Sequence, residues 1–442
     1  AEIRAARGDR AGADRDYAAF FTRWPNDPRA PDALMDRARL AMGAGDGDAA
    51  RQHLDQFVAR YPRHSQADDA IYLLADSHQD DRARGSGNAE LALAVFDRLV
   101  RTRPGSRFAD RAYLRAAHLL YSLGRYAEAD ARYRAYRGGE SGREARYWAA
   151  RTAEARGQRD RARTEFRALA GGSDYYALRA RGRLAGRSPD EGLTARGYAP
   201  IPGRPDRGTG SVLLGTAAGR TAAALLALGE RRYAHAELAR ALPRGDRAQL
   251  AAWAPALAGW GFPDLALQIG TRWGAAGEPA VYPLGFGAAI DGEARAHALD
   301  AAVVLALIRQ ESLFDAEAVS PVGARGLMQI MPATGREIAD SLGWRGAIDP
   351  QLLFEPALSL HFGSRYMADQ LARFEGFWPA VLAGYNGGPH NVARWMTFPE
   401  RGQDAELWID RIPYRETRNY VKHVYEQAAA YRRIYGSATA AR

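Results

Sequence analysis

An internal repeat near the start of the chain constrains the fold more than any other feature. Residues 20–25 (FFTRWP), 57–62 (FVARYP) and 99–104 (LVRTRP) align, with their prolines 37 and 42 residues apart. A period of this size is typical of helix-pair arrays, in which each unit buries its apolar face against its neighbours. The repeat therefore predicts an all-helical N-terminal part built from stacked helix pairs.

The residues between the prolines support this interpretation. Two alanines follow each proline at the same spacing, where helices must approach closely: Ala30 and Ala33, Ala67 and Ala70, Ala109 and Ala112. Residues 123–126 (LGRY) predict a turn between two helices, and the Gly-containing stretch 80–88 reads as a loop insertion. Residues 124–133 resemble a tetratricopeptide repeat, with a degenerate fourth copy at 145–169. Unrelated amphipathic helices are the alternative.

Changes in composition mark the remaining domain boundaries. Proline and glycine are frequent from residue 186 to residue 210, where apolar periodicity disappears. Helical spacing resumes at 221–242 and 248–260. We predict a helical-repeat domain at 1–185, a connector at 186–211, a helical linker domain at 212–283 and a third domain at 284–442.

Charge and composition narrow the class of partner. The net charge of +9 comes almost wholly from arginine, because Lys422 is the only lysine, and it favours a polyanion such as nucleic acid or cell wall. No basic stretch alternates with aromatic residues, which argues against nucleic acid. The longest apolar run, residues 301–308, is too short to span a membrane.

Several common catalytic classes can be excluded. The chain has no cysteine, no G-x-S-x-G elbow and no H-E-x-x-H motif, and Lys422 alone could serve a phosphate-binding loop. The nine histidines are scattered along the sequence, so we expect no metal site.

Glu311 is the candidate catalytic residue. Residues 299–312 predict a helix whose buried face includes Val304, Leu307 and Ile308, and Glu311 continues that stripe. No cation stands three or four residues away to hold the carboxylate ionised. Burial and the negative end of the helix dipole both raise a carboxyl pKa, as a general acid requires. The alternative is a glutamate at the rim of the helix, paired with a distant arginine.

Two further segments offer polar groups to a ligand. Residues 320–326 form a glycine-containing loop that starts with Ser320, and Gln329 and Met331 precede a helix expected to begin at Pro332. Thr334 and Glu337 predict a capping box for that helix. A helix at 378–383 should end in the turn 384–389 (GYNGGP), which would expose Tyr385.

Four ordered motifs resemble a known family. They are residues 309–314 (RQESLF), 323–332 (GARGLMQIMP), 383–389 (AGYNGGP) and 412–421 (IPYRETRNYV). Together they look like the soluble lytic murein transglycosylases of family 1, with a catalytic domain of the glycoside hydrolase family 23 type. The resemblance implies a lysozyme-like α domain at the end of an all-α chain. Gly384 departs from the alanine common before Tyr-Asn in that family.

The resemblance also implies a role for each matching residue. Glu311 would be the single acid/base, and Ser320 and Gln329 would contact the acetamido sugar. The other substrate-binding residues would be Met331 lining the cleft, Tyr385 supporting Glu311, Asn386 beside it, and Glu416 binding the stem peptide. Such enzymes cleave the β-1,4 bond from N-acetylmuramic acid to N-acetylglucosamine and leave 1,6-anhydro ends. No cofactor or metal is implied.

Partners and location follow from the same resemblance. We expect peptidoglycan strands and stem peptides as ligands, a cell-wall protein partner for the repeats, no nucleic acid and no membrane span. The chain begins at Ala1 without a charged-then-apolar leader, so a signal peptide has been removed or never existed, and the sequence alone leaves export open. The resemblance implies a periplasmic protein whose signal peptide is absent from this sequence. A goose-type-like lysozyme that uses water and a repeat adaptor with an inactive enzyme fold are the two rivals.

Overall fold

The computed structural model describes residues 1–80, 88–139, 141–187, 197–201 and 210–436. Over these residues the chain is all-helical, with three isolated β-bridges and no β-strand, as the sequence predicts. None of the described helices combines the length and the apolar character needed to cross a membrane. The chain divides into two compact units, Ala1–Pro189 with Arg394–Arg411, and Asp190–Ala393 with Ile412–Arg442.

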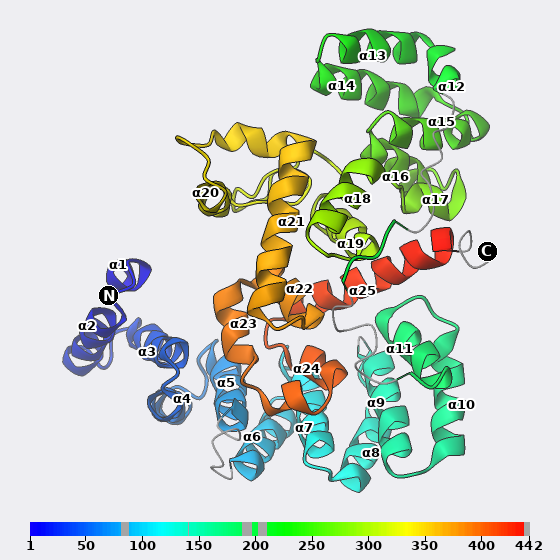
Figure 1. Ribbon diagram of the computed structural model, residues 1–442. Helices are drawn as coiled ribbons and strands as arrows, with labels where there is room; N and C mark the ends of the chain where they lie inside the picture. The colour runs from blue at the N-terminus through cyan, green and yellow to red at the C-terminus, as the bar shows by residue number, and fades with distance from the viewer. Residues whose placement is uncertain (81–87, 140, 188–196, 202–209, 437–442) are drawn as a thin grey trace. The chain divides into compact units, whose positions relative to one another are not determined.

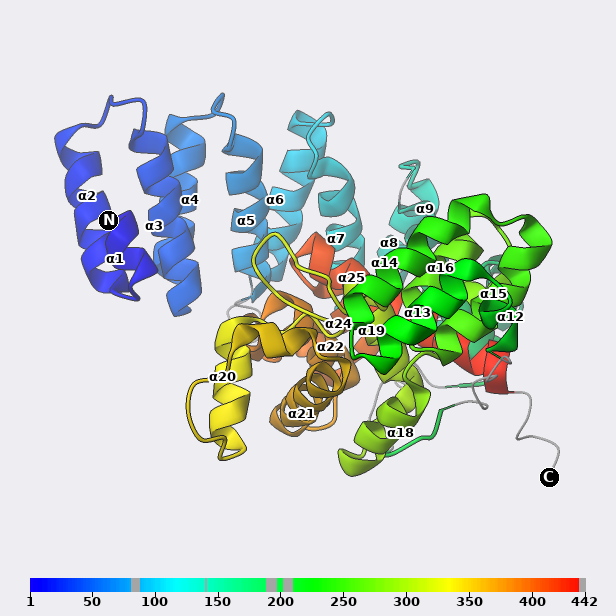
Figure 2. The same ribbon diagram turned by 90° about the horizontal axis from the view of Figure 1, so that it is seen from above.

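The first unit is an array of helix pairs. Its helices are α1 (Glu2–Ala6), α2 (Arg10–Arg23), α3 (Ala30–Ala44), α4 (Gly47–Arg60), α5 (Ala67–Asp80), α6 (Ala89–Thr102), α7 (Ala109–Ser122), α8 (Tyr126–Ala135), α9 (Gly142–Ala155), α10 (Arg159–Ala170) and α11 (Tyr175–Leu184), joined later by η4 (Pro399–Gly402) and α24 (Ala405–Arg411). Consecutive helices pack against each other, and Figure 2 shows α2 to α7 standing side by side in a row. The helix-pair prediction is confirmed.

The repeat residues act as their spacing predicts. Pro25 lies between α2 and α3, so the proline marks the link between one helix pair and the next. Pro62 and Pro104 hold the same place before α5 and α7. The paired alanines at the start of α3, α5 and α7 are all buried. Gly124 joins α7 to α8 with φ 74°, a left-handed conformation that glycine adopts without steric cost. Most of the expected insertion, residues 81–87, lies outside the described residues.

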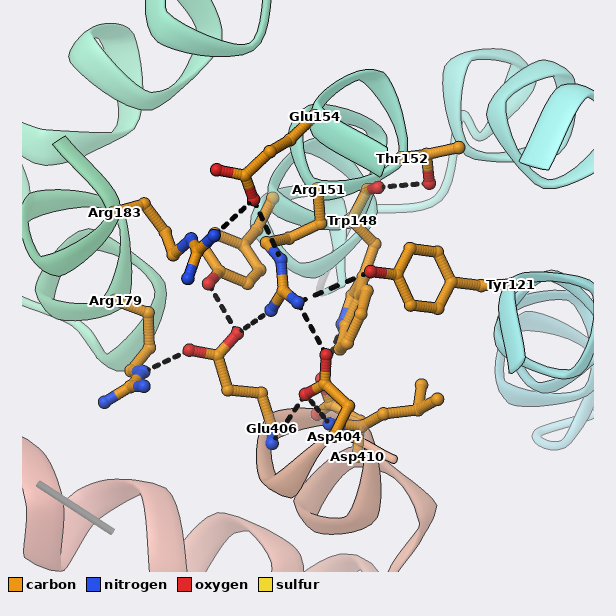
Figure 3. Close-up of polar contacts among 12 residues, drawn as sticks. Tyr121, Trp148, Arg151, Thr152, Glu154, Arg179, Arg183, Asp404, Glu406 and Asp410 are labelled. Carbon is orange, nitrogen blue, oxygen red and sulfur yellow. Dashed lines mark hydrogen bonds and ion pairs between the residues drawn. The ribbon is translucent and has the colours of Figure 1, made fainter. Parts of the chain in front are cut away.

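Helix α24 is held in the first unit by buried charges (Figure 3). The Glu406 side chain, with no exposed surface, pairs with Arg151 and lies 2.5 Å from Arg179, and the Tyr147 hydroxyl donates to it at 2.6 Å. Asp404 accepts the backbone N–H of Glu406 and pairs with Arg151 at 2.5 Å. Arg151 therefore joins α9 to both the start and the first turn of α24.

A second acid extends the same contact. Asp410, 1% exposed, accepts hydrogen bonds from the Trp148 indole at 2.7 Å and the Tyr176 hydroxyl at 2.9 Å. Arg411 pairs with Asp80 at the end of α5. Burial alone would raise the pKa of Glu406, but Arg179 and Arg151 outweigh it and hold that pKa below its ordinary 4.5. The resulting stabilisation is present above pH 4.5 and is lost as the pH falls below it.

Glu406→Gln should destabilise the first unit by about 3 kcal/mol, because it removes the buried negative charge that the Arg151 and Arg179 guanidinium groups share. Urea titration of the full chain measures the effect. Asp48→Asn is the matched control, since the Asp48 side chain is 94% exposed, and it should change stability by less than about 0.5 kcal/mol. Equal, small effects of both substitutions would contradict this account of α24.

The second unit begins with a small helical bundle. It contains α12 (Ser211–Leu214), α13 (Ala217–Ala227), α14 (Arg231–Ala241), η2 (Leu242–Arg244), α15 (Arg247–Gly259), α16 (Pro263–Arg272) and α17 (Gly277–Val281). Its core includes Trp253, Leu257, Phe262 and Leu265. The helical stretch expected at 221–242 is broken at Gly229, where φ is 80°. Of the predicted connector, only 186–187, 197–201 and 210–211 lie in the described part of the chain.

The rest of the second unit carries the sequence motifs. Its helices are α18 (Gly287–Ala296), α19 (Ala301–Ser312), α20 (Pro332–Ser341), η3 (Pro350–Phe354), α21 (Pro356–Arg373), α22 (Trp378–Gly387), α23 (Pro389–Trp395) and α25 (Arg415–Tyr435), of which α23 runs into the segment grouped with the first unit. The long helix α25 packs against both α19 and α22 (Figure 1). The three helices that bear Glu311, Tyr385 and Glu416 are therefore brought together.

Candidate active site

The site is built around the last turn of α19. This helix is buried from Ala301 through Ile308, and the half-buried Glu311 stands one residue before its end. Leu313 and Phe314 then adopt left-handed conformations, with φ 52° and 67°, which end the helix abruptly. Glu311 is thus carried by a helix whose first eight residues are buried in the core.

The end of the helix is tied to the following loop. The Ser312 hydroxyl lies 2.8 Å from the carbonyl oxygen of Leu327 and donates a hydrogen bond to it. The loop backbone is fixed in turn, because the Met328 N–H donates to the buried Ser359 hydroxyl of α21 at 3.1 Å. These bonds fix the position of the carboxyl relative to residues 327–331.

The Glu311 carboxyl has a direct partner in Tyr420. The Tyr420 hydroxyl, on α25, donates to Glu311 Oε1 at 2.5 Å. The pKa of Glu311 is raised to about 7, chiefly by burial. The hydrogen bond from Tyr420 opposes this rise, and the negative charge of Glu416 adds to it. A carboxyl with this pKa exchanges its proton near neutral pH, as a group that acts as acid and then as base must do.

Tyr385 lies close to the same carboxyl but contacts another group. Its hydroxyl donates to the carbonyl oxygen of Met328 at 2.7 Å. Burial raises the pKa of this phenol, and the charge of Glu311 raises it further. Helix α22 extends to Gly387, so Tyr385 and Asn386 lie in its last turn and not in a turn beyond it. The expected end at residue 383 was wrong, because the chain leaves the helix only at Gly388, where φ is 83°.

Gly384 has a packing role inside α22. A Cβ atom at this position would lie 3.1 Å from a ring carbon of Phe374 and 3.5 Å from the Gln370 side-chain oxygen. Phe374 is itself buried. An alanine at this position would crowd the Phe374 ring, which would have to shift by a few tenths of an ångström to admit it.

Ser320 and Gln329 close the loop between α19 and α20. The Ser320 Oγ accepts the N–H of Ala324 at 3.0 Å. Gln329 stands at φ 49°, and its side-chain N–H groups donate to the carbonyl oxygens of Ala318 and Gly326 at 3.0 and 2.9 Å. Since the amide nitrogen is used inside the loop, Gln329 can contact a ligand through its carbonyl oxygen.

Met331 directly precedes α20 and is 39% exposed. Pro332 occupies the first turn of that helix, as expected. The predicted capping box is wrong, because the N-cap residue is Met331 and Thr334 lies inside the helix, where the start makes no side-chain cap hydrogen bond. Proline supplies the helix start here by its fixed φ.

Asn386 and Glu416 belong to neighbouring helices. The Thr417 hydroxyl, on α25, donates to Asn386 Oδ1 at 2.7 Å and joins the end of α22 to the start of α25. Glu416 is exposed in the first turn of α25, and its charge acts on Glu311. The structure therefore brings Glu311, Tyr385, Asn386 and Glu416 around the meeting point of α19, α22 and α25.

Sequence reasoning missed Tyr420 as a site residue. It lies within the fourth motif and stands four residues after Glu416, on the same face of a helix. That spacing was the available signal. Its partner, however, lies 109 residues earlier, and no local pattern predicts such a pairing.

Tyr420→Phe should raise the pKa of Glu311 above its wild-type value, because the phenol stabilises the ionised carboxylate. The carboxyl ¹³C shift of Glu311 followed against pH measures this, with Glu311→Gln identifying the signal. Tyr233→Phe is the matched control, since Tyr233 is 63% exposed in the same unit. An unchanged or lower pKa in Tyr420→Phe would contradict the assigned hydrogen bond.

Two protein families match parts of the chain. Residues 288–407 match the family described as "Transglycosylase SLT domain". Residues 1–138 match the family YfiO, described as "Outer membrane lipoprotein". The first match covers α18 to α24 and therefore includes Glu311 and Tyr385, whereas α25 with Tyr420 lies beyond it.

Curated relatives align over less than half of the chain. The soluble lytic murein transglycosylase of Salmonella typhimurium is 31% identical over 201 residues, which are 46% of this chain and 31% of that protein. The Escherichia coli K12 protein of the same name is 30% identical over the same shares. The membrane-bound lytic murein transglycosylase C of Salmonella arizonae is 30% identical over 31% of this chain and 44% of its own. The match thus spans about a third of the first two relatives.

Solved structures share the fold over most of the chain. The 70 kDa soluble lytic transglycosylase from Escherichia coli aligns with a TM-score of 0.58 and 22% identity, covering 95% of this chain and 75% of that one. The lytic transglycosylase Slt from Pseudomonas aeruginosa aligns with a TM-score of 0.54 and 22% identity, covering 98% and 80%. Residues 288–407 of this chain belong to the transglycosylase SLT domain family.

Proposed function

We propose that this chain is a lytic murein transglycosylase that cleaves the β-1,4 bond from N-acetylmuramic acid to N-acetylglucosamine without water. The observation that carries the proposal is Glu311, a half-buried carboxyl with a pKa of about 7 inside the SLT domain match. The match of the chain to curated murein transglycosylases indicates peptidoglycan as the substrate class.

In the first step Glu311 donates its proton to the glycosidic oxygen, and the bond from that oxygen to C1 breaks. The N-acetylglucosamine part leaves as an alcohol. The 2-acetamido oxygen of the muramic acid stabilises the positive charge at C1, in place of a second catalytic carboxylate. The Tyr420 hydroxyl then stabilises the newly formed Glu311 carboxylate.

In the second step Glu311 acts as a base. It takes the proton of the C6 hydroxyl, and the C6 oxygen bonds to C1 as the acetamido oxygen leaves. The product is a 1,6-anhydro end, and Glu311 is protonated again. A pKa near 7 suits both steps, because neither proton transfer is then strongly uphill near neutral pH.

The surrounding residues would position the glycan. Ser320 and the carbonyl oxygen of Gln329 contact the acetamido sugar, and the exposed Met331 lines the cleft. Tyr385 and Asn386 stand beside the reacting sugar on the last turn of α22. Tyr385 supports Glu311 through its hydrogen bond to the Met328 carbonyl, which orders the loop facing the carboxyl. No cofactor enters this scheme.

The whole chain would act on the cell wall. The SLT domain cleaves glycan, and the arginine-rich helix pairs of the first unit bind the wall or a cell-wall protein, since helix-pair arrays present extended surfaces. We place the protein in the periplasm, because the relatives act on murein and the first unit matches an outer membrane lipoprotein family. In the sequence, we assign 186–211 to a connector that follows this binding array and precedes the linker domain at 212–283 and the catalytic domain at 284–442.

One observation favours a second candidate function, a lysozyme-like hydrolase on the same fold. Glu416 is a second carboxylate whose charge acts on Glu311, and a hydrolase needs such a group as nucleophile or to activate water. Its exposed position in the first turn of α25 suits a peptide-binding residue better. The ends of the cleaved glycan distinguish the two reactions. If the chain cleaves no glycan, a third interpretation applies, a repeat adaptor with an inactive enzyme fold.

Digestion of purified sacculi should release muropeptides whose muramyl ends lack one water and resist borohydride reduction. Mass spectrometry measures both properties. Glu311→Gln should slow release by at least ~10²-fold, whereas Glu317→Gln, an exposed acid paired with Arg232, serves as the matched control. Muropeptides with mainly reducible ends would identify a hydrolase. If the wild-type chain releases no muropeptides, the chain is a repeat adaptor with an inactive enzyme fold.

Glu416→Ala should weaken cleavage of peptide-bearing strands more than cleavage of peptide-free glycan, because we assign Glu416 to the stem peptide. Initial rates on both substrates at one pH measure the ratio. The substitution also removes a charge that raises the pKa of Glu311, so the peptide-free glycan is the internal control for that effect. An equal loss on both substrates would reject the peptide assignment.

A further inference from the structure

Two histidines and a glutamate, none of them assigned to catalysis, meet on the second unit. Glu293 lies on α18, and His297 directly follows the last residue of that helix. The two residues are four positions apart, about one helical turn, so their side chains lie on the same face. His361 reaches them from α21, which packs against α18. One ligand atom from each of the three residues lies within 4.8 Å of the other two. Sequence analysis predicted no metal site, because 64 residues separate the two histidines in the chain.

The distances within this cluster suit a shared metal ion. Nδ1 of His361 lies 3.2 Å from both carboxylate oxygens of Glu293, and Nε2 of His297 lies 3.5 Å from Oε2. Ligand atoms bound to tetrahedral zinc stand about 3.3 Å apart, given metal–ligand bonds of about 2.0–2.1 Å. A charge-assisted hydrogen bond would usually close to about 2.7–2.9 Å. The observed separations of 3.2 and 3.5 Å are thus close to those of ligands around one zinc ion, and the 3.2 Å contacts also lie at the long end of N–H···O hydrogen bonds.

The partners of Glu293 bear on which ligand the cluster can take. Glu406 pairs with two arginines, Arg151 and Arg179, and the buried Asp264 pairs with one histidine, His235. Glu293 is instead paired with two imidazoles. The neighbouring Arg295 is directed to Asp291 and Tyr198. A carboxylate with two imidazole nitrogens is a zinc donor set, whereas a guanidinium in the same place would repel a cation.

We propose that Glu293, His297 and His361 bind one Zn²⁺ ion, with water in the fourth position. Side-chain exposures of 23%, 18% and 42% leave the ion a path from solvent. The ion joins α18 to α21 in a chain that has no cysteine and hence no disulfide. Since α19 with Glu311 follows α18 directly, the metal stabilises the fold that carries the catalytic helix. This inference does not depend on the proposed function.

Zinc binding to the full chain tests the proposal. After treatment with EDTA and dialysis, isothermal titration with ZnCl₂ should show one ion per chain, and Zn²⁺ should raise the thermal unfolding midpoint, whereas Mg²⁺ and Ca²⁺ should not. His297→Gln and His361→Gln should each weaken zinc binding by about 100-fold or more. Loss of a residue that only hydrogen-bonds a metal ligand already lowers metal affinity by about 10–100-fold, and loss of the ligand itself should cost at least as much. Co²⁺ in the wild type should give the visible absorption of tetrahedral cobalt.

His423→Gln is the matched control, because His423 is an exposed histidine of the same unit, on α25. It should bind zinc as the wild type does. Circular dichroism of each metal-free variant shows whether the variant is folded. Equal zinc affinity in the wild type and in the double variant His297→Gln/His361→Gln would overturn the proposal, as would a wild type that binds no zinc.

Discussion

The site depends on the cost of ionising a carboxyl group that the fold has removed from water. Glu311 lies in the last turn of a helix that is buried from Ala301 to Ile308, and burial keeps its proton bound up to about pH 7. Tyr420 offsets part of that cost with a hydrogen bond to one carboxylate oxygen. The other contacts, from Ser312 to Leu327 and from Thr417 to Asn386, hold the three helices in the arrangement that keeps the carboxyl half-buried. Its environment therefore sets its chemistry.

Buried charge also organises the first unit, where it lowers the pKa of a carboxyl, that of Glu406. Two arginines hold Glu406 ionised, whereas Glu311 has a tyrosine hydroxyl and a like charge around it. A buried ion pair is weak evidence for stability, since apolar residues of similar size often serve as well. A buried ion pair is better suited to selecting one packing of the helices, because any other packing would leave a buried charge unpaired. We interpret the contacts of Glu406 and Asp410 as the reason why residues 394–411 pack with the helix pairs.

The sequence predicts much of this, where the signal is local. Prolines and alanines at a fixed spacing predict the helix pairs, and the stripe ending at Glu311 predicts a buried carboxyl. Two local predictions failed. The segment 384–389 offers three glycines, and α22 ends only where Gly388 takes the left-handed φ; α20 starts at Pro332 without a capping box. The contacts from Tyr420 to Glu311 and from Arg151 to Glu406 join residues 109 and 255 positions apart. No periodicity in the sequence records such pairings.

The most direct test of the central claim, that the fold raises the pKa of Glu311, is the free energy of unfolding of wild type and Glu311→Gln against pH. The pKa of Glu311 is about 7 in the folded protein and 4.5 in the unfolded chain. The wild type therefore keeps its full free energy of unfolding below pH 4.5, where Glu311 is protonated in both states, and loses part of it as the pH rises through 7. The variant cannot ionise, so it should gain on the wild type by up to about 3 kcal/mol between pH 4 and pH 8. A difference that stays constant across this range would show that Glu311 ionises as an ordinary glutamate and would contradict the account.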